Sequence, residues 1–405
     1  MSVVPQTRAL TPVAFAATTM CEEALSAATG VLRSGWVTTG PATARFEAEI
    51  ATLVQARYAV GTSSCTAAIE LALRGLRLPP ASKVLVSTVT FCGAVHAISH
   101  AGLTPVLVDV EPLTGMPSPD TTARAAHACG GADAMLVVHL AGYPAPVQEL
   151  TAAAGLTLDR VVEDAAHALG TWVGDRPVGS LSRATCFSFY ATKNLPIGEG
   201  GMVTTDDDEL ANFCQRARLH GMTADAWRRY LPGGSWRYTV DEAGLKANLT
   251  DLQSAIGSAQ LRHLPEWQQR REQIADRYFA GLAGLGLGLP ATPADGVHAW
   301  HLYVVRVGPE VGITRDDLAA QLAERGIGTS VHFIPLHTMA HFRATAERQP
   351  GGLPVADALF EQLLSLPLHP ALTDDDVDRV IAAMWSCVNG GQAALVNVRE
   401  EGGNR

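Results

Sequence analysis

The sequence lacks the features of a nucleic-acid-binding or membrane protein. Its 30 Lys+Arg residues against 40 Asp+Glu give a net charge of −10 over 405 residues, and no basic stretch interrupts that balance. We therefore expect no binding to a nucleic-acid backbone. No apolar run is long enough to span a bilayer, and residues 1–12 lack a basic region followed by an apolar core. We expect no membrane segment and a cytoplasmic protein.

Cysteine pairs are also absent. The cysteines are odd in number and scattered: Cys21, Cys65, Cys92, Cys129, Cys186, Cys214 and Cys387. That pattern argues against a zinc motif, a redox pair and a disulfide framework, so we expect buried, reduced thiols. His332, His337 and His341 could be read as metal ligands, but their spacing matches no dense zinc pattern. No metal is expected.

The composition indicates a globular chain of two domains. Hydrophobic residues make up 47% and charged residues 17% of the sequence, which suits ample buried surface. A chain of 405 residues is too long for one compact core. We expect a large domain over residues 1–264 and a small C-terminal α+β domain over residues 265–405.

Short apolar runs alternate with longer amphipathic ones between residues 58 and 205. Nearly continuous hydrophobic strands separated by helices predict the α/β class, with a mainly parallel sheet covered on both faces. In such sheets ligands bind at the carboxyl ends of the strands, where Asp164 falls. The expected strands are 58–61, 84–87, 105–110, 135–140, 160–163, 185–189 and 201–205, and the expected helices include 66–74, 93–100 and 147–154.

The C-terminal section has its own pattern. Asn248 and Thr250 are candidate caps for the helix that follows, and Pro265 marks a break before a long helix to about Leu282. Beyond a Gly/Pro-rich segment we expect strands at 301–307 and 328–333 and helices at 314–325 and 374–386. The tail from residue 389 is expected to be mobile.

Lys193 and Asp164 form the most informative pair in the chain. Asp164 ends an apolar run, and Lys193 lies 29 residues later (193 − 164) and just before the glycine turn 198–201. Pyridoxal phosphate chemistry needs this combination: the lysine forms a Schiff base with the cofactor aldehyde, and the carboxylate keeps the pyridine nitrogen protonated. The alternative for Asp164 is a helix N-cap.

Other residues fit the same cofactor. Residues 61–68 (GTSSCTAA) follow a strand and open a helix, so free N–H groups and the hydroxyls of Ser64 and Thr66 would hold a phosphate. The alternative is an ordinary serine N-cap. Phe91 could stack on a pyridine ring or lie in the core. Ser188 could reach the phosphate, and His167 could bond near the ring oxygen or begin a helix.

Over nearly its whole length the chain resembles the DegT/StrS-type sugar aminotransferases, which have the type I fold of pyridoxal phosphate enzymes. The resemblance depends on the order and spacing of several short segments. They are 34–41 (SGWVTTGP), 61–68, 163–167 (EDAAH), 186–189 (CFSF) with Lys193-Asn194, 248–257 (NLTDLQSAIG), 301–304 (HLYV), 328–337 (GTSVHFIPLH) and 364–368 (LSLPL).

The resemblance implies a role for each matching residue. Lys193 would be the Schiff-base lysine and the proton carrier. Asp164 would pair with the ring nitrogen, Phe91 would stack on the ring and His167 would lie beside it. The phosphate would be held by Cys65, Thr66 and Ser188; Cys65 replaces a glycine common in the family.

The resemblance also implies a homodimer with active sites at its interface. The loop 244–248 would reach the partner's cofactor phosphate through Lys246 or Asn248, and the sequence leaves open which of them makes the contact. The residues matching the family's sugar-nucleotide cleft are Trp36, Thr38, Arg229, His332 and His337.

The expected reaction moves an amino group from an amino acid, most simply glutamate, to a nucleotide-linked keto sugar, with pyridoxamine phosphate formed in between. The segments around residues 246–261 resemble members acting at C4 more than those acting at C3. A cyclitol-ketone aminotransferase would use the same machinery. Lys193 argues against a sugar dehydratase of this fold, and Lys193 with Asp164 argues against a non-catalytic sensor.

Overall fold

The computed structural model describes residues 11–223 and 236–402, with side chains up to residue 390. Among these residues the main sheet has eight strands in the order β1-β9-β8-β5-β4-β2-β3-β12. Seven strands run in one direction, and β9 runs antiparallel to both of its neighbours. The strands are β1 (Tyr58–Thr62), β2 (Lys83–Ser87), β3 (Thr104–Val108), β4 (Ala134–Val138), β5 (Val161–Asp164), β8 (Ala184–Ser188), β9 (Gly201–Thr205) and β12 (Glu347–Arg348).

The mainly parallel sheet confirms the predicted fold class. Each of the seven strands expected between residues 58 and 205 is present, with ends shifted by at most two residues. Nearly every residue of these strands is buried, which is why they read as continuous hydrophobic runs. The described residues also form two small sheets. One consists of β10 (Gly296–Val297), β6 (Trp172–Val173) and β7 (Arg176–Pro177), and the other of β11 (Tyr303–Arg306) and β13 (Leu363–Leu366).

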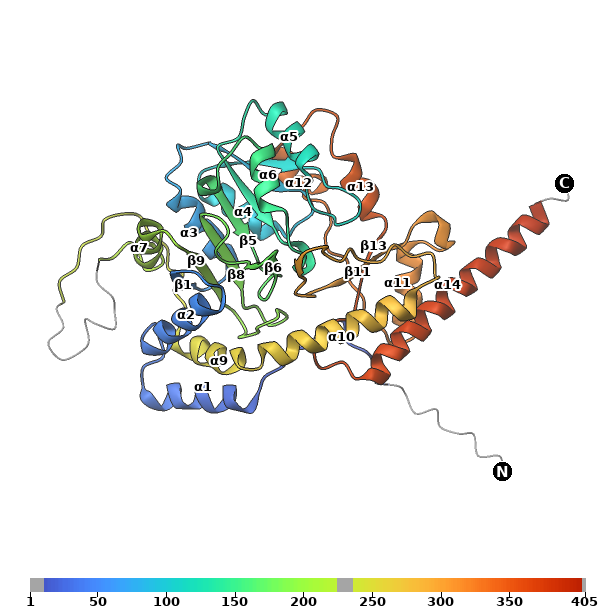
Figure 1. Ribbon diagram of the computed structural model, residues 1–405, viewed down its shortest axis with the longest axis horizontal. Coiled ribbons are helices and arrows are strands. Elements are labelled where there is room, and N and C mark those ends of the chain that lie inside the picture. The colour runs from blue at the N-terminus through green and yellow to red at the C-terminus, as the bar shows by residue number, and fades with distance from the viewer. Residues whose placement is uncertain (1–10, 224–235, 403–405) are drawn as a thin grey trace.

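Helices pack around the sheet and along one side of the molecule. Figure 1 shows α9 and α10 following one another there, with α1 beside α9 and α14 beside α10. The helices are α1 (Glu22–Ser34), α2 (Pro41–Leu53), α3 (Cys65–Gly75), α4 (Cys92–His100), α5 (Pro119–Ala128), α6 (Val147–Ala153), α7 (Asp208–Ala217), α9 (Asp251–Leu261), α10 (Leu264–Leu282), α11 (Arg315–Glu324), α12 (Ala340–Thr345), α13 (Pro354–Phe360) and α14 (Asp374–Gly402). None of the described helices is long and apolar enough to cross a bilayer.

Local signals set several helix ends. Thr250 caps α9 with a capping box in which its hydroxyl accepts from Gln253 N–H, as expected. Asn248 is not a cap; its amide donates instead to Thr39 Oγ1 at 2.7 Å. Pro265 lies in the first turn of α10, where a missing N–H costs nothing, so the break and the long helix are both confirmed.

Two expectations for the C-terminal section are wrong. Residues 328–333 are not a strand, because Gly328 N–H bonds to Val13 O at 2.9 Å and Ser330 makes only an isolated bridge to Ser365. β13 pairs with β11 in its place. The last helix does not end near residue 386 but continues to Gly402.

The apolar cores lie between the sheets and the helices that pack on them. The largest apolar cluster lies around the parallel strands and helices α3 to α6, and another fills the space between α10, α11, α14 and the β11–β13 pair. α10 contributes to more than one cluster, since Leu264 and Trp267 pack near α2 whereas Ile274 and Tyr278 pack in the C-terminal cluster. The predicted domain boundary after residue 264 stays a prediction.

Candidate active site

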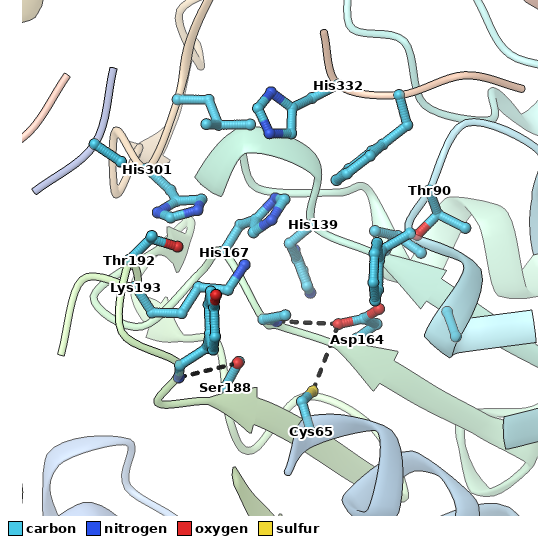
Figure 2. A pocket seen from close by; sticks show the side chains of 18 of the residues that line it. Cys65, Thr90, His139, Asp164, His167, Ser188, Thr192, Lys193, His301 and His332 are labelled. Carbon is cyan, nitrogen blue, oxygen red and sulfur yellow. Dashed lines mark hydrogen bonds between the residues drawn. The ribbon is translucent and has the colours of Figure 1, made fainter. Parts of the chain in front are cut away.

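A cavity of about 600 Å³ opens where the strands β4, β5 and β8 end and helix α3 begins. Figure 2 shows side chains from these elements turned toward it. The parallel strands bring their carboxyl ends to one edge of the sheet, so residues far apart in sequence meet there. The predicted site residues that line the cavity are Ser64, Cys65, Thr66, Phe91, Asp164, His167, Ser188, Lys193 and His332.

Lys193 lies on the turn after β8, where its N–H donates to Tyr190 O at 2.9 Å. Its Nζ has no hydrogen-bond or ion-pair partner among the described residues. Part of the side chain forms the cavity wall, while the surrounding protein removes most water from the amine. That burial lowers the pKa of Lys193 to about 8, although Asp164 and Cys65 act in the opposite direction. A lysine amine that is partly neutral near physiological pH is a usable nucleophile and base.

Asp164 is the last residue of β5 and is only 6% exposed. Its Oδ1 accepts from Ala166 N–H at 3.0 Å, and the Cys65 thiol lies 3.9 Å from the same oxygen. Burial raises the pKa of Asp164, whereas the Ala166 N–H, Lys193 and His139 favour its charged form. Residues 165–171, all of them described, form no helix, so the N-cap alternative for Asp164 is wrong.

The start of α3 provides an anion-binding corner. Ser64 is the N-cap and accepts from Ala67 N–H at 3.2 Å, so the serine-cap alternative is correct as a description of its bonding. The Thr66 hydroxyl, by contrast, has no partner among the described residues. A Cβ at Gly201 would lie 2.4 Å from the Ser64 carbonyl carbon and 2.6 Å from Cys65 N, so glycine allows β9 to approach the helix start this closely. Ser188 faces the same corner from β8 (Figure 2).

Phe91 is 60% exposed and lies at the mouth of the cavity, before the first turn of α4. The alternative of a core phenylalanine is therefore wrong. Its ring lies 6.3 Å from that of Phe333, which lines the same cavity. An exposed aromatic face beside a cavity is available to stack on a flat ligand.

His167 has a defined tautomer. Ala141 N–H donates to its Nδ1 at 3.2 Å, so the proton of the neutral ring is on Nε2. Burial, together with Lys193 and His332, holds the pKa of His167 well below its usual value. The residue thus presents a neutral N–H donor to the cavity. It follows β5 without beginning a helix, so the helix-start alternative is wrong.

His301 and Asn194 are site residues that the sequence prediction missed. The His301 ring lies 4.4 Å from that of His167, and its Nδ1 is 3.0 Å from Asn194 Oδ1. Because Asn194 Nδ2 donates to Ala299 O at 2.8 Å, the amide oxygen is the acceptor for His301. The signals were present, since Asn194 follows Lys193 and His301 opens the HLYV segment. Their contact across the chain was not visible in the sequence.

A second missed pair lies behind Asp164. His139 and Glu163 are both fully buried, and His139 Nε2 is 2.7 Å from Glu163 Oε2. Ala145 N–H donates to the other ring nitrogen, which makes Nε2 the donor to the carboxylate. Ser182 and Thr185 hydroxyls donate to the remaining oxygen of Glu163. This satisfied network fixes the end of β5, from which Asp164 projects.

His332 lies on the opposite wall, toward the C-terminal section (Figure 2). Its Nδ1 is 2.9 Å from Ser365 Oγ, and its ring stacks on Phe15 at 5.6 Å. Burial, with Lys193, lowers the pKa of His332 to about 4, so the ring is neutral at physiological pH.

Five predicted residues do not line the cavity. Trp36 Nε1 donates to Thr39 O at 3.2 Å, and Thr38 O accepts from Asp251 N–H at 3.2 Å. Lys246 is exposed and bonds to Asn248, which also bonds to Thr39. His337 is held between Thr88 Oγ1 and Asp357 Oδ1, each at 2.9 Å. Arg229 lies outside the described residues. Trp36, Thr38 and Asn248 thus lie around Thr39 and do not line the cavity.

The donors in the cavity suit a phosphorylated aromatic aldehyde. A helix start with a free hydroxyl can hold the phosphate, an exposed aromatic ring can cover a flat face, and a buried carboxylate can meet a protonated ring nitrogen. An amine with a pKa of about 8 faces the same space. A fold of this kind with such a site defines a pyridoxal phosphate-dependent enzyme.

Known proteins agree with this class. SpsC, a spore coat polysaccharide biosynthesis protein of Bacillus subtilis, is 42% identical over 372 residues, which cover 91% of this chain and 95% of SpsC. The structure of Spr1654 from Streptococcus pneumoniae, described as a sugar aminotransferase in its PMP form, matches with a TM-score of 0.85 and 32% identity over 94% of this chain and 100% of that chain. DesV of S. venezuelae matches with a TM-score of 0.80 and 36% identity over 90% and 94% of the two chains.

The chain belongs to the DegT/DnrJ/EryC1/StrS aminotransferase family, whose model matches residues 18–385. The predicted family, the aminotransferase activity and the pyridoxal phosphate cofactor are therefore confirmed. The individual site residues are not tested by these comparisons, and their roles remain our predictions.

Proposed function

We propose that this enzyme transfers an amino group from glutamate to a nucleotide-linked keto sugar, at C4 in preference to C3. The proposal depends above all on one observation: Lys193, Asp164, the start of α3 and Ser188 all face a single cavity of about 600 Å³. That volume lies in the range of small-molecule sites, which suits a cofactor with one substrate portion beside it.

Different residues of the chain would hold different parts of the cofactor. Thr66, Ser188 and the N–H groups of residues 65 and 66 would hold its phosphate, and Phe91 would cover its ring. Asp164 would accept the ring N–H, and Lys193 would hold the cofactor covalently through Nζ. When bound, pyridoxal phosphate supplies an electron-withdrawing ring that weakens the Cα–H bond of an attached amino acid.

Lys193 Nζ would then move the proton. With a pKa of about 8, the amine accepts a proton at neutral pH and gives it up again without a large free-energy penalty. His167, with its proton on Nε2, would donate a hydrogen bond beside the ring. His332 would orient the substrate from the opposite wall as a neutral ring. Because His167, His301 and His332 are uncharged, they add no positive charge that would lower the pKa of Lys193 further.

The sugar substrate is supported by the relatives. SpsC is named for polysaccharide biosynthesis, and Spr1654 is described as a sugar aminotransferase. The C4 preference depends on the segments 246–251 and 255–261, which resemble members acting at C4. The seven cysteines are unpaired, which supports a reducing compartment and hence the cytoplasm.

We also propose a homodimer in which the loop 244–248 completes the partner's site. Lys246 is exposed and neither it nor Asn248 lines the cavity of its own chain. The Lys246 cation, with Trp36 and Thr38 close by around Thr39, would therefore contribute to the active site of the neighbouring subunit. Arg229, which lies outside the described residues, is proposed as a substrate-binding residue from the resemblance alone.

The substrate is tested with the pyridoxamine phosphate form of the enzyme. Mixing it with a panel of nucleotide-linked 4-keto and 3-keto sugars should restore the absorption of the aldehyde form fastest with a 4-keto sugar. A cyclitol ketone serves as the competing substrate. If only the cyclitol ketone restores the band, the nucleotide-sugar proposal is overturned.

The shared site is tested by subunit mixing. Lys193→Ala chains are combined with chains carrying Lys246→Ala and Asn248→Ala. With shared sites, each mixed dimer contains one site with an intact lysine and an intact partner loop, so activity rises to about half of wild type per mixed dimer. No recovery would mean that the loop serves its own chain, and full activity of the loop variant on its own would mean that the loop serves neither site.

A further inference from the structure

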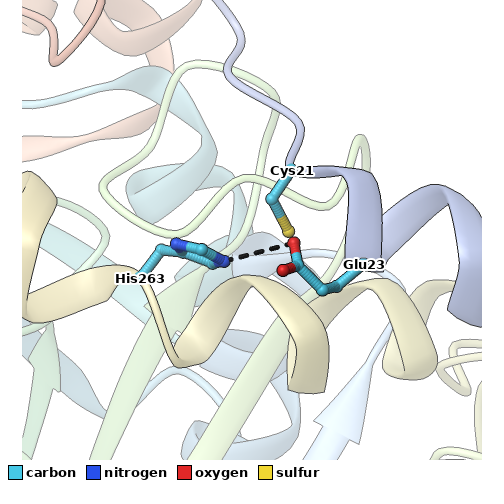
Figure 3. A group of neighbouring side chains, drawn as sticks. All are labelled: Cys21, Glu23 and His263. Carbon is cyan, nitrogen blue, oxygen red and sulfur yellow. Dashed lines mark ion pairs between the residues drawn. The ribbon is translucent and has the colours of Figure 1, made fainter.

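Three side chains that ligate metals meet outside the active site. Cys21 precedes the first turn of α1, Glu23 lies in that turn, and His263 precedes α10. One ligand atom from each lies within 4.8 Å of the others. Figure 3 shows the Cys21 sulfur beside the Glu23 carboxylate, with the imidazole of His263 directed toward both. Sequence spacing could not show this cluster, because α1 and the α9–α10 junction are far apart in the chain.

The cluster is held in place by a buried glutamine. Gln260 is fully buried in α9, and its Oε1 accepts from Cys21 N–H at 3.0 Å. Its Nε2 donates to Thr19 O at 2.9 Å and to Pro196 O at 2.8 Å. Since Gln260 lies three residues before His263, it fixes the backbone at Cys21 relative to the histidine. The His263 ring is also oriented, because it stacks on Trp267 at 5.7 Å with an interplanar angle of 21°.

The spacing suits a tetrahedral ion. His263 Nε2 and Glu23 Oε2 are 3.4 Å apart. Two ligands bound to Zn²⁺ at about 2.0–2.1 Å and separated by a tetrahedral angle are about 3.3–3.4 Å apart. A zinc-bound sulfur at about 2.3 Å would lie about 3.5 Å from each of them. The Cys21 sulfur lies within 4.8 Å of both atoms, and a rotation of its side chain at the open helix start would bring it to this separation.

We propose that Cys21, Glu23 and His263 bind one Zn²⁺ ion per chain. On binding, the Cys21 thiol loses its proton to solvent and a Zn–S bond forms, while His263 Nε2 and one Glu23 oxygen take two further positions. Water completes the tetrahedron, because the cluster lies at the surface. Thiolate, imidazole and carboxylate together favour zinc over magnesium or calcium, which prefer oxygen ligands alone.

The site has a direct structural link to the active site. The segment just before Cys21 forms part of the cavity wall through Phe15, Ala16 and Ala17. Thr18 Oγ1 donates to Ala191 O at 2.8 Å, two residues before Lys193. Zinc at Cys21 would restrain this wall segment against α9 and α10. Amide hydrogen exchange over residues 15–21 should therefore slow when zinc binds.

The test uses the metal-free, cofactor-loaded enzyme in equilibrium dialysis against zinc sulfate, with elemental analysis of the protein. We expect one zinc per chain, and an affinity at least about tenfold weaker in Cys21→Ser and in His263→Gln. Cys129→Ser and His127→Gln are matched controls, since each removes the same kind of side chain from a part-exposed or exposed position elsewhere. Transaminase activity in all four variants shows that they are folded.

A second measurement locates the ion. Zinc should slow the alkylation of Cys21 by iodoacetamide, followed by peptide mass spectrometry, and leave the alkylation of Cys129 unchanged. Equal zinc binding by wild type and both cluster variants would overturn the proposal, as would the absence of any stoichiometric zinc in the wild type. In either case His263 and Glu23 form only an ion pair.

Discussion

In the cofactor-free enzyme Lys193 should ionise near pH 8. Burial lowers its pKa from the ordinary 10.5 to about 8. At a pH of about 7.5, about a quarter of such an amine is neutral, against about 0.1% of an ordinary lysine. The site should therefore contain about 240 times more reactive amine than a solvent-exposed lysine would offer. The rate should rise with pH through a midpoint near 8 and level off about one pH unit above it.

Asp164 opposes the effect of burial on Lys193. Its negative charge raises the pKa of Lys193, and burial lowers it. Asp164→Asn removes the charge and keeps the shape, so the midpoint for Lys193 should move below the wild-type value and the amine should react at lower pH. Asp175→Asn, an exposed carboxylate in the turn between β6 and β7, is the matched control and should leave the midpoint unchanged.

The assay measures the reaction of Lys193 separately from that of the other lysines. Cofactor-free enzyme is reacted briefly with pyridoxal over a range of pH, the adduct is trapped with borohydride, and the Lys193 peptide is quantified by mass spectrometry. Lys83 and Lys246 are the only other lysines in the sequence and are followed in the same digest. A wild-type midpoint close to 10.5 would refute the effect of burial, and an upward shift in Asp164→Asn would refute the effect of the Asp164 charge.

Three further predictions concern the same site. Asp164→Asn should still bind pyridoxal phosphate at saturating concentration but lose most turnover, whereas unchanged turnover would mean that the carboxylate does not face the ring nitrogen. Gly201→Ala should raise the dissociation constant for pyridoxal phosphate about tenfold in an absorbance titration, because its Cβ would lie 2.4 Å from the Ser64 carbonyl carbon. Gly30→Ala, with open space around it, should leave this constant unchanged. Asn194→Ala should lower the free energy of unfolding by about 1–3 kcal/mol, because His301 and Ala299 O lose their buried partner; denaturant titration showing no change would contradict this.

The main sheet could be predicted because its strands are buried on both faces and so have a strong local signal. The segment expected as a strand at 328–333 (GTSVHF) has only two apolar residues, Val331 and Phe333, and its backbone groups are divided between Val13 on one side and Ser365 on the other. Asn389, Gly390 and Gly391 follow the helix end expected near residue 386. Glycine costs a helix about 1 kcal/mol per residue relative to alanine, which disfavours α14 there without ending it.

The site was predictable where chemistry and local position coincide. Asp164 and Ser188 end strands, Ser64 precedes a helix, and Lys193 precedes a glycine turn, so each has a local signal. His301 opens the HLYV segment, but its role could not be predicted from it, because that role depends on a contact with Asn194 across 107 positions of sequence. The His139–Glu163 pair is similar, since a buried histidine and a buried glutamate become a network only when β4 and β5 lie side by side.

The effect of Cys65 becomes clear only from its contacts in the structure. From the sequence, a cysteine in place of the family's glycine should matter little if the phosphate contact there uses the backbone. The structure directs its thiol toward Asp164, with Sγ 3.9 Å from Oδ1 and 3.5 Å from Cys186 O. Burial and Asp164 raise the pKa of Cys65 well above its usual value, so the thiol stays protonated. Cys65 therefore adds a neutral, weakly donating group beside Asp164 and leaves that carboxylate as the only negative charge of the pair, which is the condition for holding a protonated ring nitrogen.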